Sequence, residues 1–309
     1  MKEVIENYYD LSILGFIKVN DYVYKIKSDQ YYYLKFVSDD TLNHIVDYIE
    51  SLHLKCFVDI LKNKDNQILT SYQDYYFYLM EALDESQDEL KEIKMKTYFE
   101  TLSYLHYHSC YYLKVNQEYF KKIYHDINHI IEERTQYYDD IMKSCEQKVY
   151  RSPSQWLFVL NYYRIMNSLY TAKMYLKKFM DLVVHVSSLR VCLVYKNFDY
   201  QHISLKNRKL LSIDHMSIDI PIYDIYDIYS KLPDILFDLD CLSDYYLKTM
   251  VLNDYEKVLL CTLLNVVPVI YLEDDEISNI IKISRLLYYI DSICTLSSKL
   301  DIQISHENK

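Results

Sequence analysis

The sequence has 309 residues; half of them are hydrophobic and about a quarter are charged, which is ordinary for a globular protein. Its single glycine, Gly15, excludes a Walker A loop, a Rossmann fingerprint and a complete protein-kinase glycine-rich loop, because each needs several glycines in a short span. The net charge of −11 disfavours nucleic acids and anionic membranes as partners, so neither is expected.

The first eighty residues predict a small β-rich unit with one inserted helix. Alternating β-branched and aromatic residues predict strands within 11–37, and apolar residues at helical spacing predict a helix over 42–52. Two further short strands are predicted at 67–70 and 75–80. This unit is expected to end near residue 82.

The pattern of the remaining residues predicts mostly helix. Helical spacing predicts helices over 90–105 and 127–145, and a third helix begins at Pro153. The predicted apolar face of this third helix consists of Trp156, Leu160, Tyr163, Met166 and Tyr170. Strand-like segments at 190–195 and 210–214 interrupt the pattern before helices return over 222–299. The predicted organisation is a β-rich lobe at 1–82 and a helical lobe at 83–309, with a hairpin at 190–215.

Three features of the sequence bear on the cellular location of the protein: its cysteines, its N-terminus and its longest apolar run. The seven cysteines are scattered and form no C-x-x-C pair, which predicts neither a zinc site nor a disulfide framework and fits a reducing cytoplasm. The charged N-terminus has no apolar stretch typical of a signal peptide. The longest apolar run, 258–272, is short for a membrane span. We therefore expect a cytoplasmic protein.

Three groups of segments carry a resemblance to a known family. They are 22–26 with 32–35, then 78–82 with 102–106, and finally 195–203 with 211–214 and 221–225. In this order they resemble the nucleotide-lysine strands, the hinge with its L-x-x-L-H helix, and the catalytic and metal-binding motifs of the aminoglycoside and choline phosphotransferase superfamily. The sequence looks closest to its divergent spore-coat kinase-like branch.

The resemblance implies an α+β, bilobal kinase-like fold. It has a small antiparallel β-sheet N-lobe with one helix and a large, mainly helical C-lobe. ATP and Mg²⁺ are the implied cofactors. The implied partners are a nucleotide and other proteins of a coat-like assembly. The resemblance also implies that the protein could be associated with the spore.

The resemblance also assigns roles to individual residues. Lys35 falls on the phosphate-contacting lysine, and Glu50 on the following helix is the preferred acidic partner for it, with Asp47 as the alternative. Met80 to Ala82 fall on the hinge that offers backbone groups to a purine. Asp214 falls on the aspartate that holds Mg²⁺.

The catalytic loop departs from the family pattern. The preferred alignment places Asn197 on the catalytic aspartate and His202 on the metal-binding asparagine. Asn cannot act as a carboxylate base, and an imidazole nitrogen matches Mg²⁺ less well than oxygen does. An alternative alignment, shifted by two residues, keeps Asp199 as the catalytic aspartate and places Ser204 on the asparagine.

These departures leave two functions open. The first is a kinase-like protein with impaired catalysis and a structural, nucleotide-sensing or spore-coat-related role. The second is an active ATP-dependent small-molecule phosphotransferase, with Asp199 as the base, Asp214 on Mg²⁺ and Lys35 on phosphate. Both readings require Lys35 and Asp214 to converge on one site.

Overall fold

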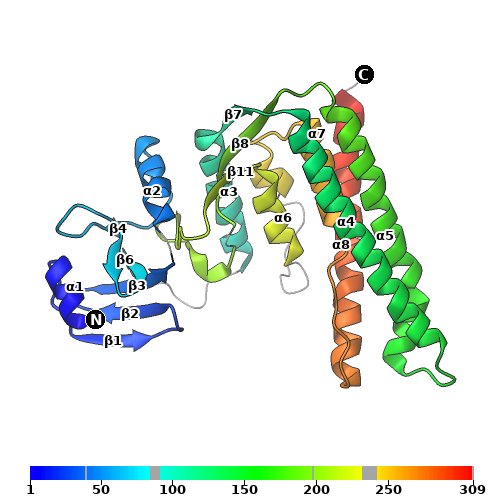
Figure 1. Ribbon diagram of the computed structural model, residues 1–309, viewed down its shortest axis with the longest axis horizontal. Coiled ribbons are helices and arrows are strands. Elements are labelled where there is room, and N and C mark those ends of the chain that lie inside the picture. Colours follow the sequence, from blue (N-terminus) through cyan, green and yellow to red (C-terminus); the bar gives the residue numbers. More distant parts are fainter. Residues whose placement is uncertain (39, 84–90, 197, 232–241, 308–309) are drawn as a thin grey trace. The chain divides into compact units, whose positions relative to one another are not determined.

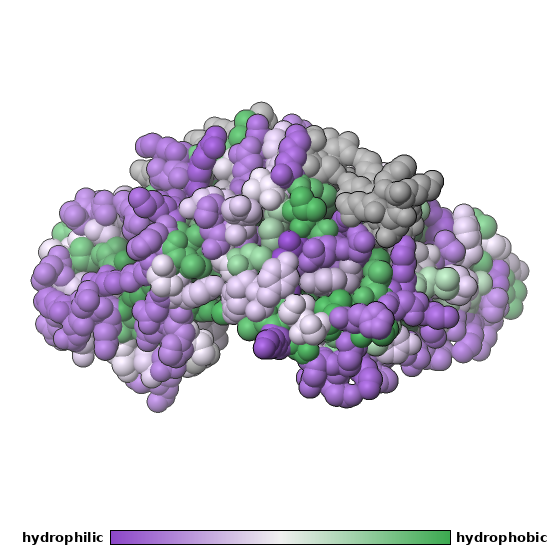
Figure 2. All heavy atoms as spheres, turned by 90° about the horizontal axis from the view of Figure 1, so that it is seen from above, coloured by the Kyte–Doolittle hydropathy of each residue, from purple (hydrophilic) through white to green (hydrophobic). Residues whose placement is uncertain are grey.

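The computed structural model describes residues 1–38, 40–83, 91–196, 198–231 and 242–307 (Figure 1). The chain forms two compact units: Met1–Ser109 with Leu193–Ile218, and Cys110–Cys192 with Asp219–Lys309. The first unit thus joins the N-terminal part of the chain to a much later segment. None of the helices in the described ranges combines the length and the hydropathy that a membrane span needs. Hydrophilic residues cover much of the surface visible in Figure 2, with hydrophobic groups between them.

The first unit is built on an antiparallel sheet with strand order β1-β2-β3-β6-β4, in which β5 also pairs with β6. Its elements are α1 (Lys2–Tyr8), β1 (Gly15–Lys18), β2 (Val23–Lys27), β3 (Tyr31–Val37), α2 (Thr41–Ser51), β4 (Ile60–Leu61), β5 (Thr70–Tyr72), β6 (Tyr75–Glu81), α3 (Lys91–Ser109), the 3₁₀ turn η1 (Tyr200–His202), β9 (Ile203–Ser204) and β10 (Lys209–Leu210). The strands predicted within 11–37 and the helix predicted over 42–52 are confirmed. The strand predicted at 67–70 lies later, at β5, and α1 was not predicted.

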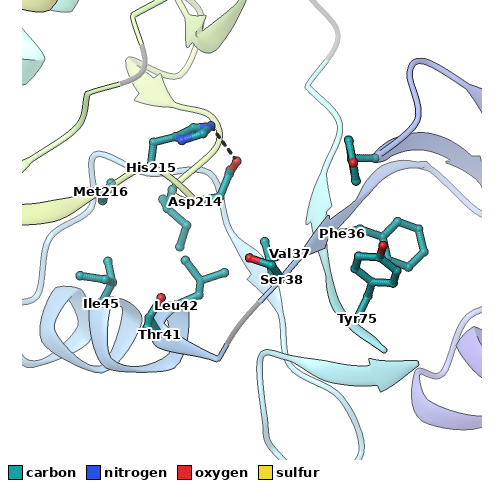
Figure 3. A pocket seen from close by; sticks show the side chains of 12 residues that line it. Phe36, Val37, Ser38, Thr41, Leu42, Ile45, Tyr75, Asp214, His215 and Met216 are labelled. Atoms are coloured by element: carbon teal, nitrogen blue, oxygen red, sulfur yellow. Dashed lines mark ion pairs between the residues drawn. The ribbon is translucent and has the colours of Figure 1, made fainter. Parts of the chain in front are cut away.

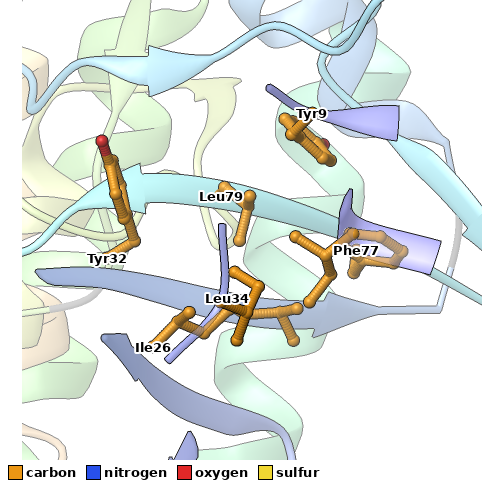
Figure 4. Packing of buried hydrophobic residues seen from close by; sticks show 8 residues of the cluster. Tyr9, Ile26, Tyr32, Leu34, Phe77 and Leu79 are labelled. Carbon is orange, nitrogen blue, oxygen red and sulfur yellow. The ribbon is translucent and has the colours of Figure 1, made fainter. Parts of the chain in front are cut away.

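Side-chain alternation divides the sheet into two faces. Successive residues of a strand point to opposite faces, so Leu34 of β3 and Leu79 of β6 share one face while Lys35 and Tyr78 share the other. The first face forms an apolar core with Tyr9, which follows α1, and Figure 4 shows this packing. The Tyr9 hydroxyl lies 3.0 Å from that of Thr70, which ties the helix end to β5.

Segment 209–211 is fastened to the first eighty residues by backbone bonds. The N–H of Leu210 donates to the carbonyl of Cys56 (2.7 Å), and the N–H of Val58 donates to the carbonyl of Leu210 (3.0 Å). Lys209 Nζ lies 2.8 Å from the Asp59 carboxylate. The predicted pairing of 190–195 with 210–214 is not formed, because β10 pairs with β9 across a short turn instead.

The second unit is mainly helical. Its elements are β7 (Tyr111–Lys114), α4 (Gln117–Glu146), α5 (Pro153–Val183), β8 (Ser188–Val194), α6 (Ile222–Ser230), the π-helical η3 (Leu242–Tyr246), α7 (Asp254–Asn265) and α8 (Glu276–Glu307); the chain passes between the units within β8 and β11 (Ser217–Asp219). The helix predicted to start at Pro153 is confirmed. Ser152 caps it, because the Ser152 hydroxyl accepts from the Gln155 N–H while the Gln155 side chain accepts from the Ser152 N–H.

The sequence pattern identified the wrong face of α5 as the core face. Phe158, Ile165 and Leu176 are fully buried, whereas Trp156 and Tyr163 are exposed. The helix carries two apolar stripes on opposite sides, and each has helical spacing. Periodicity alone therefore could not decide which stripe faces the core.

A buried ion pair fastens β8 to the start of α7 within the second unit. Arg190 contacts both carboxylate oxygens of Glu256, which is fully buried, and its Nε donates to Oε1 at 2.9 Å. Glu256 Oε2 also accepts from the N–H of Asn253 at 2.8 Å, completing the capping box of α7. A bidentate pair with a third hydrogen bond satisfies the carboxylate in a site that water does not reach.

Removing one partner of this pair should destabilise the protein strongly. Arg190→Leu would leave the carboxylate of Glu256 buried without its counter-charge, which costs about 3–5 kcal/mol. Urea denaturation should show this loss, while Lys121→Leu, which breaks the exposed pair with Glu118, should cost less than about 1 kcal/mol. Equal losses in the two variants would contradict the argument.

Candidate functional site

Lys35 and Asp214 form an ion pair at the centre of the candidate site. Lys35 Nζ lies 2.9 Å from Asp214 Oδ1 and 3.2 Å from Oδ2, although the residues are 179 positions apart in sequence. Both side chains are largely buried, with 13% and 16% of their surfaces exposed. The structure thus brings together the two residues on which both functional readings depend.

Local backbone geometry places the two charges. Lys35 lies on β3 opposite Tyr78 of β6, so both side chains project from the face that lies away from the α1 core. Asp214 follows Ser212, whose φ of 67° is in the left-handed region. That conformation costs a non-glycine residue about 1 kcal/mol. The Ser212 hydroxyl accepts a hydrogen bond from the Lys35 ammonium, a contact that helps to hold this turn.

The hydroxyl of Tyr78 completes the network. Tyr78 is fully buried and donates to Asp214 Oδ1 at 2.9 Å. Burial first, and then the negative charge of Asp214, raise the pKa of the Tyr78 hydroxyl well above its usual value, so it remains a donor at neutral pH.

The pKa of Asp214 reflects opposing effects. Burial by itself would raise this pKa, but the positive charge of Lys35 and the hydrogen bonds from Lys35 and Tyr78 outweigh it. The net result is a pKa below the ordinary value for aspartate. Asp214 is therefore a carboxylate at neutral pH, and its charge is balanced by Lys35.

A cavity of about 610 Å³ opens beside this ion pair. The turn between β1 and β2, the sheet residues Lys35 and Met80, and the later segment that carries Asp214 line this cavity. The lining residues are Val19, Asn20, Asp21, Tyr22, Val23, Tyr33, Lys35, Phe36, Met80, Gln201, His202, Leu211, Ser212, Asp214 and His215. Its volume is within the usual range for a pocket that binds a small molecule or cofactor.

A second cavity, of about 470 Å³, lies on the α2 side of Asp214 (Figure 3). Leu42 and Ile45 of α2 line it, together with His215 and Met216. His215 is exposed, and its Nε2 lies 3.4 Å from Asp214 Oδ2. Asp214 thus lines both cavities, and the imidazole of His215 lies beside its Oδ2.

The predicted pairing of Glu50 with Lys35 is not formed. Glu50 is exposed, and its carboxylate lies 2.8 Å from Lys62 Nζ. The reason is the orientation of α2: Val46 and Ile49 face the core, so Glu50, about 100° further round the helix, points away from it. Asp214 takes the place beside Lys35 that Glu50 was expected to fill.

The hinge residues are engaged in the sheet. Met80 is buried and lines the 610 Å³ cavity, opposite Tyr33 of β3. The N–H of Ala82 donates to the carbonyl of Tyr31 (2.9 Å), so this amide is used in the structure rather than directed at the cavity.

The catalytic-loop candidates are placed only in part. Asn197 lies outside the described residues. Asp199 is exposed, and its Oδ1 accepts from the N–H of Gln201 at 2.7 Å, which caps η1. Gln201 and His202 line the cavity beside Lys35, whereas Asp199 is not among its described lining residues. Within the described part of the chain, no three His, Cys, Asp or Glu residues are grouped to hold a metal ion.

Sequence reasoning missed two members of the network, Tyr78 and Ser212. The position of Tyr78 could have been inferred from strand register, because it lies directly across from Lys35 once β3 and β6 are paired. Ser212 offered no comparable signal, since its role follows from a positive φ that a serine rarely adopts.

The effects of Lys35 and Asp214 on the free energy of unfolding should be coupled, because each side chain neutralises the other. Lys35→Met should cost roughly 3 kcal/mol, because it leaves a buried carboxylate unpaired, and Asp214→Leu in addition should restore part of this loss. A double-mutant cycle by urea denaturation would measure the coupling. The exposed pair Lys62–Glu50 is the matched control and should give less than about 1 kcal/mol. Comparable coupling energies in the two cycles would contradict the conclusion that burial strengthens the Lys35–Asp214 pair.

Acid should weaken the contribution of the Lys35–Asp214 pair to stability over a defined range of pH. The pKa of Asp214 is lower in the folded protein than the value near 4 of an unfolded aspartate, so its stabilising effect is complete above about pH 4. The effect is lost as pH falls through the folded pKa. The stability difference between the parent and Asp214→Asn should be constant from pH 7 to 5 and shrink below pH 4. A difference unchanged down to pH 2 would contradict the assigned pKa direction.

Comparison with known proteins identifies the fold. No family model matches the sequence, and no curated protein matches it significantly. An aminoglycoside phosphotransferase from Alicyclobacillus acidocaldarius subsp. acidocaldarius DSM 446 is similar in structure, with a TM-score of 0.74 and 10% identity over 99% of this chain and 96% of that one.

Spectinomycin phosphotransferase APH(9)-Ia is also similar. Its complex with ADP and spectinomycin has a TM-score of 0.58 and 12% identity, over 96% of this chain and 97% of that one. Its AMP-bound complex has a TM-score of 0.56 and 13% identity, over 86% and 87%. The predicted α+β, bilobal kinase-like fold is confirmed: the chain has the fold of the aminoglycoside phosphotransferases.

Proposed function

We propose that this protein binds a nucleotide in the cavity beside Lys35 and Asp214, and that its capacity for phosphoryl transfer is impaired. The observation that carries the binding proposal is the convergence of these two charges, 2.9 Å apart, at the wall of a cavity of about 610 Å³. Spectinomycin phosphotransferase, which has a similar fold, has been crystallised with ADP and with AMP, and this supports the proposal.

Both partners of the ion pair suit a nucleotide polyphosphate. The ammonium of Lys35 supplies a counter-charge for phosphate oxygens. Asp214 supplies the oxygen ligand that Mg²⁺ prefers, and Mg²⁺ commonly takes only one or two protein carboxylates besides phosphate and water. Because Lys35 and Asp214 neutralise each other in the structure, binding requires that their mutual contact be exchanged for contacts with the ligand.

Two of the described residues that line the cavity carry carboxylates, Asp21 and Asp214. Asp21 is exposed and lies 2.8 Å from Lys18 Nζ, so Asp214 is the residue that we propose to hold Mg²⁺. His202 lines the same cavity, but its imidazole nitrogen suits Mg²⁺ less well than an oxygen ligand would. We therefore expect magnesium to improve nucleotide binding modestly and the binding itself to depend mainly on Lys35.

Impaired transfer follows from the chemistry of the loop. Under the preferred alignment Asn197 occupies the position of the base, and an amide cannot accept the proton of an attacking hydroxyl. The alternative base, Asp199, is exposed and engaged in capping η1. A protein that binds without efficient transfer would suit a nucleotide-sensing or structural role, such as the coat-like assembly that the sequence resemblance implies.

Calorimetric titration with ATP and ADP, with and without Mg²⁺, tests the binding proposal. The parent protein should bind, and Lys35→Met should bind about 10–100-fold more weakly, because a charge-assisted contact is lost. Lys27→Met is the matched control: this exposed strand lysine does not line the cavity and should leave affinity unchanged. Absence of binding at millimolar nucleotide, or equal binding by the Lys35 variant, would refute the proposal.

A phosphate-release assay tests the second part. The parent should turn over ATP very slowly, and Asn197→Asp should raise the rate by restoring a carboxylate, by about 10²-fold or more. Asp199→Asn should leave the slow rate unchanged. If the parent is active and Asp199→Asn abolishes that activity, the protein is instead an active phosphotransferase with Asp199 as its base.

A further inference from the structure

Helix α5 presents an apolar stripe to solvent on the side opposite its core face. Within the second unit the helix packs against α4, α7 and α8, as the ribbon in Figure 1 shows. The stripe comprises five large side chains that remain about half or more exposed: Trp156 (47%), Leu160 (66%), Tyr163 (69%), Tyr170 (64%) and Met174 (54%). Trp156 is the single tryptophan of the chain. We name these residues and Asn167, which is also exposed, the α5 stripe.

The spacing of the α5 stripe is that of a helix-pairing seam. Its positions, from 156 to 174, follow one another at intervals of four and three residues. Apolar residues at this alternating interval form the a and d positions of a heptad, which face a partner helix. A single Asn at an a position is a known device for fixing register in such pairs. Asn167 lies at the equivalent position here, with Tyr163 and Tyr170 on either side.

The stripe reads nearly the same in both directions from Asn167. Tyrosines stand four residues before and three residues after it, and Leu160 and Met174 stand seven residues before and after. A two-fold axis through Asn167 and perpendicular to the helix would therefore oppose Tyr163 to Tyr170, and Leu160 to Met174. A two-fold dimer interface must be self-complementary in this way.

We propose that the α5 stripe is the interface of a homodimer, in which two copies of α5 pack antiparallel about a two-fold axis at Asn167. The occupant of the stripe is thus a second copy of this chain. Dimerisation is independent of the nucleotide proposal, since no residue of the α5 stripe belongs to the unit that holds Lys35.

Charge distribution favours the antiparallel arrangement over the parallel one. Lys177 continues the seam three residues after Met174 and is exposed. In a parallel pair it would meet its own copy, which is unfavourable for like charges. In the antiparallel pair it lies ten residues after the axis, level with Trp156 eleven residues before it, and so does not meet its own copy. The Arg151 guanidinium already lies over the Trp156 ring, 4.9 Å from its centroid, so it is the separation of the two Lys177 charges that favours the antiparallel pair.

The area available is sufficient for a specific interface. Covering the exposed parts of three aromatic and two aliphatic side chains would remove roughly 600 Å² from each copy, since a large aromatic side chain accounts for about 150–250 Å². The total of roughly 1,200 Å² is at the lower end of stable interfaces, so we expect a dimer that dissociates in the micromolar range.

Sedimentation velocity over about 1–100 µM protein tests the interface. The parent should shift from monomer to dimer, and the double variant Tyr163→Glu with Tyr170→Glu should weaken the dimer roughly 100-fold or more, because it places four carboxylates at the seam. Both tyrosines are exposed, so circular dichroism should remain unchanged. Tyr112→Glu on β7, 61% exposed, is the matched control and should dimerise normally. A parent that is monomeric throughout, or a double variant that dimerises like the parent, would overturn the proposal.

Cysteine cross-linking tests the direction of the helices. In a Cys294→Ser background, Asn167→Cys should form a disulfide-linked dimer on mild oxidation, whereas Leu160→Cys and Met174→Cys should each cross-link poorly alone and efficiently when mixed. The background protein without an added cysteine serves as the control. Efficient self-linking of Leu160→Cys would instead indicate a parallel pair and overturn the antiparallel arrangement.

Discussion

The contact between Lys35 and Asp214 is the constraint on which the candidate site depends. A charge held in a largely buried place needs a partner, because the cost of losing water exceeds what the fold could otherwise supply. Lys35 and Asp214 satisfy each other, with Tyr78 and Ser212 completing their hydrogen bonds. The same arrangement holds a cation and an anion ready at the wall of one cavity, so the stability of the empty site and its capacity to bind a charged ligand have a common origin.

Backbone bonds make that contact reproducible. Residues 56–58 and Leu210 exchange two backbone hydrogen bonds, and Lys209 pairs with Asp59. Asp214 therefore follows, by four residues, a point that is fixed to the same unit as the sheet. The left-handed turn at Ser212 then directs the carboxylate toward Lys35. Side chains so positioned lose little further freedom when they exchange one partner for another.

Through its resemblance to a known superfamily, the sequence predicted the kinase-like fold and pointed to Lys35 and Asp214 as members of one site. The residue pattern alone gave only their context, a strand around Lys35 and an apolar run before Asp214. It was insufficient for the acidic partner, because helical spacing shows which residues share a face but not that Glu50 would pair with Lys62. It also misassigned α5, whose two apolar stripes have equal periodicity. Orientation about a helix axis is settled by tertiary packing, which no local pattern contains.

The discontinuity of the first unit has a consequence for biosynthesis. Lys35 and Asp214 are separated by 179 positions, so at ordinary translation rates the ribosome delivers the acid on the order of tens of seconds after the base. The hairpin of α4 and α5, whose contacts are local, is complete before then. The nascent sheet therefore waits for its acid while α4 and α5 are synthesised, and the segment that creates the site is present before α7 and α8, the last helices of the second unit, have been made.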